Sequence, residues 1–391
     1  MVGPLLHSAP VPPVTRMPPS TVTDQDVRHL RRAVELALRG RGSTSPNPLV
    51  GAVVVKDGRA IGEGFHVRAG EAHAERAALE ACTEDPAGAT LYVSLEPCCH
   101  EGRTPPCTDA IVAAGIGRVV VASDDPTPKA SGRGLGILRD EGIAVDVLDG
   151  EEVGRAARLI NQPFRKHART GRPAVVFKSA MTLDGKVATR NGDSQWISGE
   201  ASRARAHRWR ADCDAVAVGI HTATLDDPLL TARIEGVARQ PRRVVFDSEA
   251  SLPLDSKLVR SVSEVPVILV CSRAAQRARV EALRNAGVEV IVTTGENEAA
   301  RVRSALDELG ARDVHSLLLE GGPHLAGVFL EAGEIDEARM FVAPLLIGGR
   351  EARAAIEGEG IERIADAVRA VDVDVERIDD DVLISARLRE W

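Results

Sequence analysis

The chain has 391 residues, and its 49 Lys and Arg against 57 Asp and Glu give a formal net charge of −8. Hydrophobic residues make up 44% and charged residues 27%, a globular composition that excludes fibrous or wholly disordered architectures. The acidic balance and an aromatic content of only 3% argue against nucleic acid as a partner, because such binders need basic surfaces and aromatic stacking platforms. A small-molecule enzyme is therefore the leading expectation.

Residues 1–22 are proline-rich and lack regular apolar periodicity, which predicts a flexible tail outside the fold. No apolar run approaches the roughly 18 residues of a membrane span, and no signal peptide is recognisable, so we expect no membrane partner. The chain has six cysteines without a secretory context, which predicts reduced thiols in a cytoplasmic protein. Three of them, Cys82, Cys213 and Cys271, lie isolated in apolar stretches and are expected to be buried and inert.

The first half alternates helical and strand patterns. Thr23, with Asp26 three residues later, predicts a helix start, and apolar residues at helical spacing continue until Gly40 and Gly42. Strands are expected at 49–55, 60–63, 90–95, 119–122 and 144–148, and helices from about 73, from 108 and after 134. Residues 23–150 are therefore predicted to form one layered α/β domain.

A second alternating series follows a basic, helix-prone connector at residues 151–172. Strands are expected at 174–179, 215–219, 243–247, 267–271, 288–293 and 316–320, with helical stretches between them. Residues 173–391 are accordingly predicted to form a second, larger α/β domain.

Residue types that bind metal gather in the first half. His73 and Glu75 form a His-x-Glu that precedes a helix, and Pro97-Cys98 and Cys107 follow later. This is the zinc deaminase signature, in which one His and two Cys hold Zn²⁺ and leave the fourth position to a water of lowered pKa. We expect His73, Cys98 and Cys107 as the ligands of one Zn²⁺, and Glu75 as the catalytic acid/base that moves protons from water to the departing amine.

The spacing differs from the short Pro-Cys-x-x-Cys form, because Glu101 stands where the second Cys would otherwise be. Pro105 and Pro106 keep this insert out of a helix, so Cys107 is expected to open the next helix, where the helix dipole stabilises a thiolate. The alternative is a structural zinc knuckle made of Cys98, Cys99, His100 and Cys107, which leaves the His-x-Glu without a purpose.

Several long motifs of the first half resemble those of the bifunctional riboflavin biosynthesis family, which joins a pyrimidine deaminase to a reductase. They are Ser45-Pro46-Asn47-Pro48-Leu49-Val50-Gly51, Gly70-Glu71-Ala72-His73-Ala74-Glu75, the block from Glu96 to Cys107, and Ala130-Ser131-Gly132-Arg133-Gly134. The resemblance implies a cytidine-deaminase-like α/β/α domain in which Asn47, His66 and Arg103 hold the pyrimidine and its phosphate. This chain has Cys99 where the family usually has Ser, and Thr127 where it usually has Asn.

The second half lacks a G-x-G-x-x-G fingerprint, but Leu319-Glu320-Gly321-Gly322 runs from a strand into a helix. With the motifs Lys178 to Lys186, Gly192 to Ser198 and Thr222 to Arg233, this segment resembles the reductase of the same family, which implies a dihydrofolate-reductase-like fold and NADPH. The implied cofactor-binding residues are Ala180, Trp196, Thr222, Asp226, Ser248, Gly322, Pro323, His324, Leu325, Ala326, Gly327 and Val328. The implied substrate-binding residues are Ser194, Arg210, Leu230, Arg233 and Glu320.

The sequence does not identify the residue that donates the proton in the reduction. Asp226 and Glu320 are both candidates, although Asp226 before Asp227-Pro228 also suits a turn. Trp196 suits either a cover over the nicotinamide or a place in the core.

The resemblance therefore implies an enzyme for two consecutive steps of riboflavin biosynthesis. Its substrate is a phosphorylated pyrimidine ribosylamine, which is first deaminated with Zn²⁺ and then reduced with NADPH at the ribosyl group. The competing hypotheses are a nucleoside or nucleic-acid base deaminase with a merely structural second domain, and a zinc-knuckle binding module. A homo-oligomer is compatible with either enzyme hypothesis.

Overall fold

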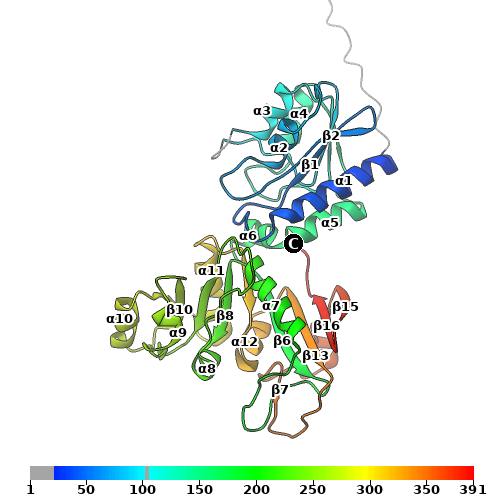
Figure 1. Ribbon diagram of the computed structural model, residues 1–391. Coiled ribbons are helices and arrows are strands. Elements are labelled where there is room, and N and C mark those ends of the chain that lie inside the picture. Colours follow the sequence, from blue (N-terminus) through cyan, green and yellow to red (C-terminus); the bar gives the residue numbers. More distant parts are fainter. Residues whose placement is uncertain (1–21, 102–104) are drawn as a thin grey trace, which may run out of the picture.

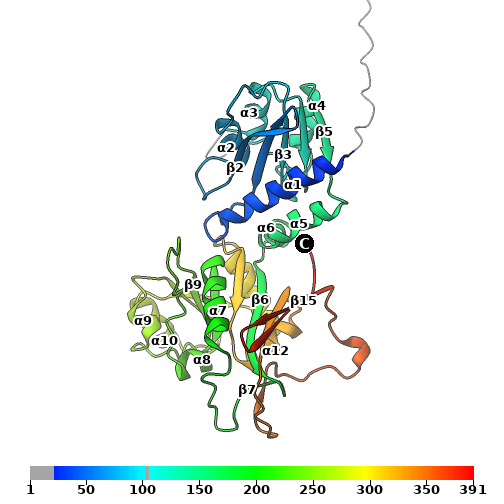
Figure 2. The same ribbon diagram turned by 45° about the vertical axis from the view of Figure 1, so that its right-hand side comes forward.

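The computed structural model describes residues 22–101 and 105–391, so the predicted tail lies almost wholly outside the described part. The described chain forms two α/β bodies, one above the other in Figure 1, with two short helices between them (Figures 1 and 2). This arrangement confirms the predicted α/β class. No helix of the described residues has the length and apolar character needed to cross a membrane.

The N-terminal body contains a five-stranded sheet in the order β2-β1-β3-β4-β5. Its strands are β1 (Gly51–Lys56), β2 (Arg59–Phe65), β3 (Thr90–Val93), β4 (Arg118–Val121) and β5 (Ala144–Val147). Its helices are α1 (Asp24–Ala37), the 3₁₀ turn η1 (Leu38–Gly40), α2 (Ala74–Glu80), α3 (Cys107–Ala113) and α4 (Arg133–Asp140). The predicted hairpin is β1 with β2, while β3, β4 and β5 run parallel.

Apolar residues cover both faces of this sheet. On one face, side chains of α2, α3 and α4, such as Ala78, Ile111 and Leu138, pack against the sheet. On the other face, α1 contributes Leu30 and α5 (Glu152–Ile160) contributes Ala157. The result is the expected α/β/α layering, and the loops that leave β3 and β4 emerge at one edge of the sheet.

The connector consists of α5 and α6 (Gln162–Thr170), and Asn161 lies at their junction. The larger body follows, with a nine-stranded sheet in the order β11-β10-β9-β8-β12-β6-β13-β16-β15. These strands are β6 (Ala174–Thr182), β8 (Ala215–Gly219), β9 (Arg242–Phe246), β10 (Val267–Ser272), β11 (Glu289–Thr293), β12 (Ser316–Leu319), β13 (Glu337–Ala343), β15 (Asp372–Ile378) and β16 (Asp381–Arg387). A separate pair is formed by β7 (Lys186–Ala188) and β14 (Arg353–Ala354).

Helices cover both faces of the large sheet. They are α7 (Glu200–Asp212), α8 (Ile220–Leu225), α9 (Lys257–Arg260), α10 (Arg277–Asn285), α11 (Glu298–Gly310) and α12 (Pro323–Glu331), with the 3₁₀ turn η2 at Ile364–Asp366. Val302 and Phe329 pack on one face, and Leu258 and Leu283 on the other. Beyond the predicted strands, the structure contains β7 and β13 to β16, of which β15 and β16 form an antiparallel pair at one edge.

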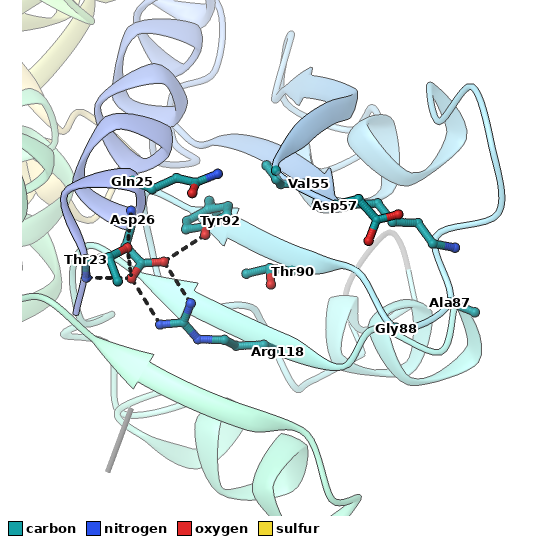
Figure 3. A pocket seen from close by; sticks show the side chains of 12 residues that line it. Thr23, Gln25, Asp26, Val55, Asp57, Ala87, Gly88, Thr90, Tyr92 and Arg118 are labelled. Atoms are coloured by element: carbon teal, nitrogen blue, oxygen red, sulfur yellow. Dashed lines mark hydrogen bonds and ion pairs between the residues drawn. The ribbon is translucent and has the colours of Figure 1, made fainter. Parts of the chain in front are cut away.

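The predicted start of α1 is confirmed by a capping box. The Thr23 hydroxyl accepts from the Asp26 backbone N–H, and the Asp26 carboxylate accepts from the Thr23 N–H at 2.8 Å. The same carboxylate accepts from the Tyr92 hydroxyl and the Arg118 guanidinium, both at 2.8 Å, beside a polar pocket of about 410 Å³ (Figure 3). Burial alone would raise the pKa of Asp26, but these donors outweigh it and lower the pKa from 3.8 to about 2.

Replacing Asp26 by Asn is expected to reduce the free energy of unfolding by about 2 kcal/mol at pH 7, because one pKa unit corresponds to about 1.4 kcal/mol. The folded-state pKa is the lower one, so this stability is present above pH 4 or so and is lost as the pH falls towards 2. Urea unfolding of both proteins at pH 7 and pH 3 measures the difference, with Asp24→Asn in the same helical turn as the control. If the two proteins differ in free energy of unfolding by as much at pH 3 as at pH 7, the lowered pKa of Asp26 is contradicted.

Candidate active sites of the deaminase and reductase bodies

The metal-binding residue types converge at the edge of the small sheet. His73 is the N-cap of α2, Cys98 follows β3, and Cys107 is the first residue of α3, as predicted. The Nδ1 atom of His73 lies 3.4 Å from the Sγ atom of Cys98 and 3.3 Å from that of Cys107. All three donor atoms lie within 4.8 Å of one another, so one imidazole and two thiols face a common point. This soft and borderline donor set fits Zn²⁺.

Glu75 stands beside this donor set on the first turn of α2 and is only 3% exposed. Burial raises the pKa of its carboxyl to about 7, and the negative charge of Cys98 adds to the effect. Hydrogen bonds from Cys107 and His73 outweigh the burial of Cys98 and lower the pKa of that thiol to about 4. A carboxyl with a pKa near neutrality is suited to taking up and giving back a proton at the working pH.

Cys99 turns away from this donor set. Its Sγ atom faces the Lys129 carbonyl oxygen at 3.7 Å, and the residues grouped around His73 include neither Cys99 nor His100. The geometry therefore favours the His-Cys-Cys set over the zinc knuckle. The Cys107 N–H donates to the Cys98 carbonyl oxygen at 3.1 Å, so a backbone hydrogen bond holds the start of α3 against the loop that carries Cys98.

Replacing Cys107 by Ala is expected to weaken zinc binding by on the order of 100-fold or more and to abolish deamination, since one of three protein ligands is lost. Cys99→Ala is the matched control, because that thiol lies outside the donor set. Zinc content measured on both purified variants decides the point. Loss of zinc from Cys99→Ala with full retention in Cys107→Ala would contradict the ligand assignment.

The predicted pyrimidine-binding residues Asn47 and His66 are neighbours of the donor set. The Nδ2 atom of Asn47 lies 3.0 Å from Nε2 of His66, and Nδ1 of His66 lies 3.0 Å from the Ala72 carbonyl oxygen. Since a carbonyl oxygen only accepts, Nδ1 carries the proton and Nε2 accepts from Asn47. The His66 and His73 rings meet edge to face at 5.3 Å. Arg103, the third predicted contact, lies outside the described residues.

The second site is a cavity of about 2130 Å³ in the larger body. Its volume exceeds the roughly 300–1,000 Å³ of a pocket for one small molecule, so a dinucleotide and a second ligand fit together. The predicted residues that line it are Ala180, Ser194, Trp196, Arg210, Thr222, Asp226, Leu230, Arg233, Ser248, Glu320, Gly322, Pro323, His324, Leu325 and Val328. The start of α12 at Gly322 presents backbone N–H groups to the cavity, which suits a phosphate.

Two predicted cofactor residues do not line the cavity. Ala326 is fully buried in the core, and Gly327 faces the backbone of Glu357, which leaves no room for a side chain. Both lie on the side of α12 that packs against protein. Ala326 and Gly327 were included in the predicted cofactor site because they follow Gly322 in the same sequence motif. Only one side of a helix can face a ligand, however, and these two residues lie on the other side.

An ion pair between Arg210 and Glu320 lines this cavity. Arg210 binds both carboxylate oxygens of Glu320, at 2.6 and 2.9 Å, from the last turn of α7. Burial would raise the pKa of Glu320, but Arg210 outweighs it and lowers the pKa to about 2. The carboxylate is therefore ionised and accepts hydrogen bonds, which does not favour the hypothesis that Glu320 donates the proton.

Lys178 is a site residue that the sequence analysis quoted only as part of a motif. It lies on β6, lines the cavity and stands close enough to Glu320 and Arg210 for their charges to act on it. Burial lowers the pKa of its ammonium group, partly offset by Glu320. A charged Lys within the largely apolar sequence of β6 is the signal that could have marked this residue.

Trp196 and Asp226, for which the sequence left two interpretations open, also line the cavity. Trp196 is 68% exposed and stacks with the Arg203 guanidinium at 4.7 Å, which excludes a place in the core. Asp226 follows α8 and accepts from Gln195 at 3.4 Å. Both residues are thus available to a ligand.

The fold and the two sites define a zinc-dependent deaminase joined to a nicotinamide-dependent reductase. Residues 23–123 match the cytidine and deoxycytidylate deaminase zinc-binding region, and residues 173–384 match the RibD C-terminal domain. Riboflavin biosynthesis protein RibD of Actinobacillus pleuropneumoniae is 42% identical over 93% of this chain and 95% of its own length. The Escherichia coli protein of the same description is 38% identical over 92% and 98%. The chain belongs to the RibD family of bifunctional riboflavin biosynthesis enzymes.

Solved structures of two relatives match the chain over more than nine tenths of its length. Acinetobacter baumannii RibD, form 1, superposes with a TM-score of 0.82 at 38% identity and covers 94% of this chain and 99% of its own. A diaminohydroxyphosphoribosylaminopyrimidine deaminase/5-amino-6-(5-phosphoribosylamino)uracil reductase from Thermotoga maritima gives 0.80 at 35% identity, over 93% and 99%. The expected fold class, enzyme class and cofactors, Zn²⁺ and NADPH, are confirmed.

Proposed function

We propose that this chain deaminates 2,5-diamino-6-(ribosylamino)-4(3H)-pyrimidinone 5′-phosphate and then reduces the ribosyl group to give 5-amino-6-(5-phosphoribitylamino)uracil. The observation that carries the proposal is the presence of two separate sites in one chain, a His-Cys-Cys set with Glu75 beside it and a cavity of about 2130 Å³. Family membership supports the order of the two steps. When bound, zinc supplies a water of lowered pKa and NADPH supplies a hydride.

In the deaminase site, His73, Cys98 and Cys107 hold the metal and Glu75 acts on the reacting atoms. Glu75 takes a proton from the water that adds to C2 of the pyrimidine, and gives it to the amino group that leaves as ammonia. Asn47 and His66 orient the pyrimidine, and Arg103 binds its phosphate.

In the reductase site, the residues that line the cavity divide between cofactor and substrate. Trp196, Thr222, Asp226, Ser248 and the start of α12 bind NADPH. Ser194, Leu230, Arg233 and the Arg210–Glu320 pair hold the substrate. Arg233, which is exposed at the cavity, is placed to bind the 5′-phosphate, whereas Arg210 is held by Glu320. With NADPH bound in this cavity, a hydride would be delivered to C1′ of the ribosyl group, the C1′–O4′ bond would break, and the released ring oxygen would take up one proton, so that NADPH and one proton are consumed for each ring opened.

Incubation of the full chain with this substrate in the absence of NADPH tests the first step. We expect ammonia release and accumulation of the ribosyl product, with no ammonia from cytidine or from tRNA. Ammonia release from cytidine instead of the diaminopyrimidinone would favour the base-deaminase hypothesis. No release from any of them would contradict the deaminase assignment.

We also propose the domain division 23–150 and 173–391 with a connector at 151–172, and a tail at 1–22. The two sheets, at 51–147 and 174–387, support this division. The cysteines among the described residues form no disulfide, which supports a reducing, cytoplasmic location.

The edge strand β15 supports a homo-oligomer. Val373 and Val375 alternate along it, and Val371 immediately precedes it. The three are 61% (Val371), 55% (Val373) and 63% (Val375) exposed, so they form an apolar row in contact with solvent. We propose that a second copy of the chain covers this row. Light scattering is expected to give a dimer that dissociates in Val375→Glu and persists in Val292→Glu, on the opposite edge strand. A monomeric wild type would contradict this proposal.

A further inference from the structure

The helix α6 lies between the two bodies in both views (Figures 1 and 2) and is fixed to the reductase body by buried contacts. The Lys166 ammonium group is 2% exposed and binds Glu334 at 3.2 Å and Asp336 at 2.8 Å. The ring of His167 stacks on that of His315 at 3.8 Å. Because these partners belong to the reductase body, α6 is packed firmly against that body.

The same helix also holds the loop that carries Asn47. Asn161, at the start of α6, is 2% exposed. Its Oδ1 atom accepts from the Leu49 N–H at 2.8 Å, and its Nδ2 atom donates to the Leu49 carbonyl oxygen at 2.9 Å. These two bonds fix both backbone polar groups of a residue two positions from Asn47, and so restrict where Asn47 can lie.

One turn further along, Arg165 holds the loop that leaves β4. Its guanidinium is 2% exposed, and Nη1 donates to the Ser123 hydroxyl at 3.2 Å and to the Asp124 carbonyl and carboxylate oxygens at 2.9 and 2.8 Å. The Ser123 carbonyl oxygen accepts from the Glu96 N–H at 2.9 Å. Glu96 is two residues before Cys98, so the contact reaches the metal-ligand loop through one backbone hydrogen bond.

Arg165 and its neighbour Gln162 bind the reductase body at the same time. The Nε atom of Arg165 donates to the Trp391 carbonyl oxygen at 2.6 Å, and Gln162 accepts from the Trp391 N–H at 2.8 Å. The Trp391 indole donates to Asp336 at 2.9 Å, which also binds Lys166. One guanidinium thus joins the β4 loop of the deaminase to a segment that follows the last strand of the reductase.

We propose that Asn161 and Arg165 are positioning residues for deamination, and that the reductase body, through α6, holds the substrate loop and the metal-ligand loop of the deaminase in their working geometry. Neither residue touches the reacting atoms. Their effect is geometric, and displacements of about 1 Å can cost up to 100-fold in rate. The inference rests on the proposed deaminase function.

The test uses the full chain with zinc bound and compares Asn161→Ala and Arg165→Met with Arg169→Met, an exposed arginine on the same helix. Deamination is measured as KM and kcat separately, and reduction is measured on the deaminated intermediate with NADPH. Zinc content and Tm are recorded for each protein. Arg165→Lys, which keeps the positive charge but has one donor nitrogen in place of three, serves as the conservative variant.

We expect kcat/KM for deamination to fall on the order of 10- to 100-fold in Asn161→Ala and Arg165→Met, with a rise in KM for Asn161→Ala. Zinc content, reduction and the Arg169→Met control should equal wild type, and Arg165→Lys should recover part of the loss. Unchanged deamination in both variants would overturn the inference, as would parallel loss of both activities with a lowered Tm. A wild type that releases no ammonia would instead contradict the proposed function.

Discussion

A Glu75→Gln variant is expected to lose deamination by at least about a thousandfold while it keeps its zinc and its reductase activity. Gln has the same shape but cannot accept the proton of the attacking water or return it to the departing amine. Glu75 is buried in direct contact with the donor set, close enough for the charges of Cys98 and His73 to act on it, so it is the carboxylate placed for this transfer. The reductase cavity lies in the other body and is not altered by this change.

The measurement is ammonia release per enzyme together with zinc content. Glu80→Gln, on the exposed end of the same helix, is the matched control and should behave as wild type. Deamination at the wild-type rate in Glu75→Gln would contradict the acid/base assignment. Loss of zinc in that variant would show that the carboxylate holds the metal site together instead.

The second large effect concerns the reductase: Arg210→Met is expected to lower kcat/KM for NADPH oxidation on the order of 100-fold and to leave deamination unchanged. The variant removes a cation from the cavity and leaves the Glu320 carboxylate without its two hydrogen bonds. Breaking a buried pair typically costs about 3–5 kcal/mol, so a lowered free energy of unfolding is expected as well.

Arg208→Met is the control for this experiment, because Arg208 is exposed on the same helix. Absorbance at the nicotinamide band follows the reduction, and urea unfolding follows the stability. Reduction at the wild-type rate in Arg210→Met would show that the pair neither binds substrate nor orders the site.

Local patterns explain why the small domain could be predicted closely. Thr23 and Asp26 form their capping box within one turn, and Cys107 opens α3 because Pro105 and Pro106 prevent an earlier start. The predicted strands of this body agree with the observed ones to within two residues. The zinc ligands could be predicted because His-x-Glu and Pro-Cys are short motifs. Each lies within one loop or at the start of one helix, so its geometry depends on neighbouring residues only.

Long-range packing explains what the sequence left unpredicted. The strand β13 (Glu337–Ala343) begins with two charged residues among its first three, and Asp and Glu interrupt the apolar residues of β15, so neither segment looks like a buried strand. In β15 the alternating valines were the missed signal. Arg165 and Asn161 belong to a stretch that looks like a solvated basic connector, and only the tertiary fold makes them buried.

The most direct test of two consecutive reactions on one chain is the stoichiometry of ammonia and NADPH in a single vessel. With the diaminopyrimidinone ribosylamine phosphate and NADPH, the wild-type protein should release one ammonia for each NADPH oxidised, and without NADPH it should still release ammonia. With NADPH present, ammonia release that is followed by no NADPH oxidation would contradict the account, and so would NADPH oxidation that precedes and exceeds ammonia release.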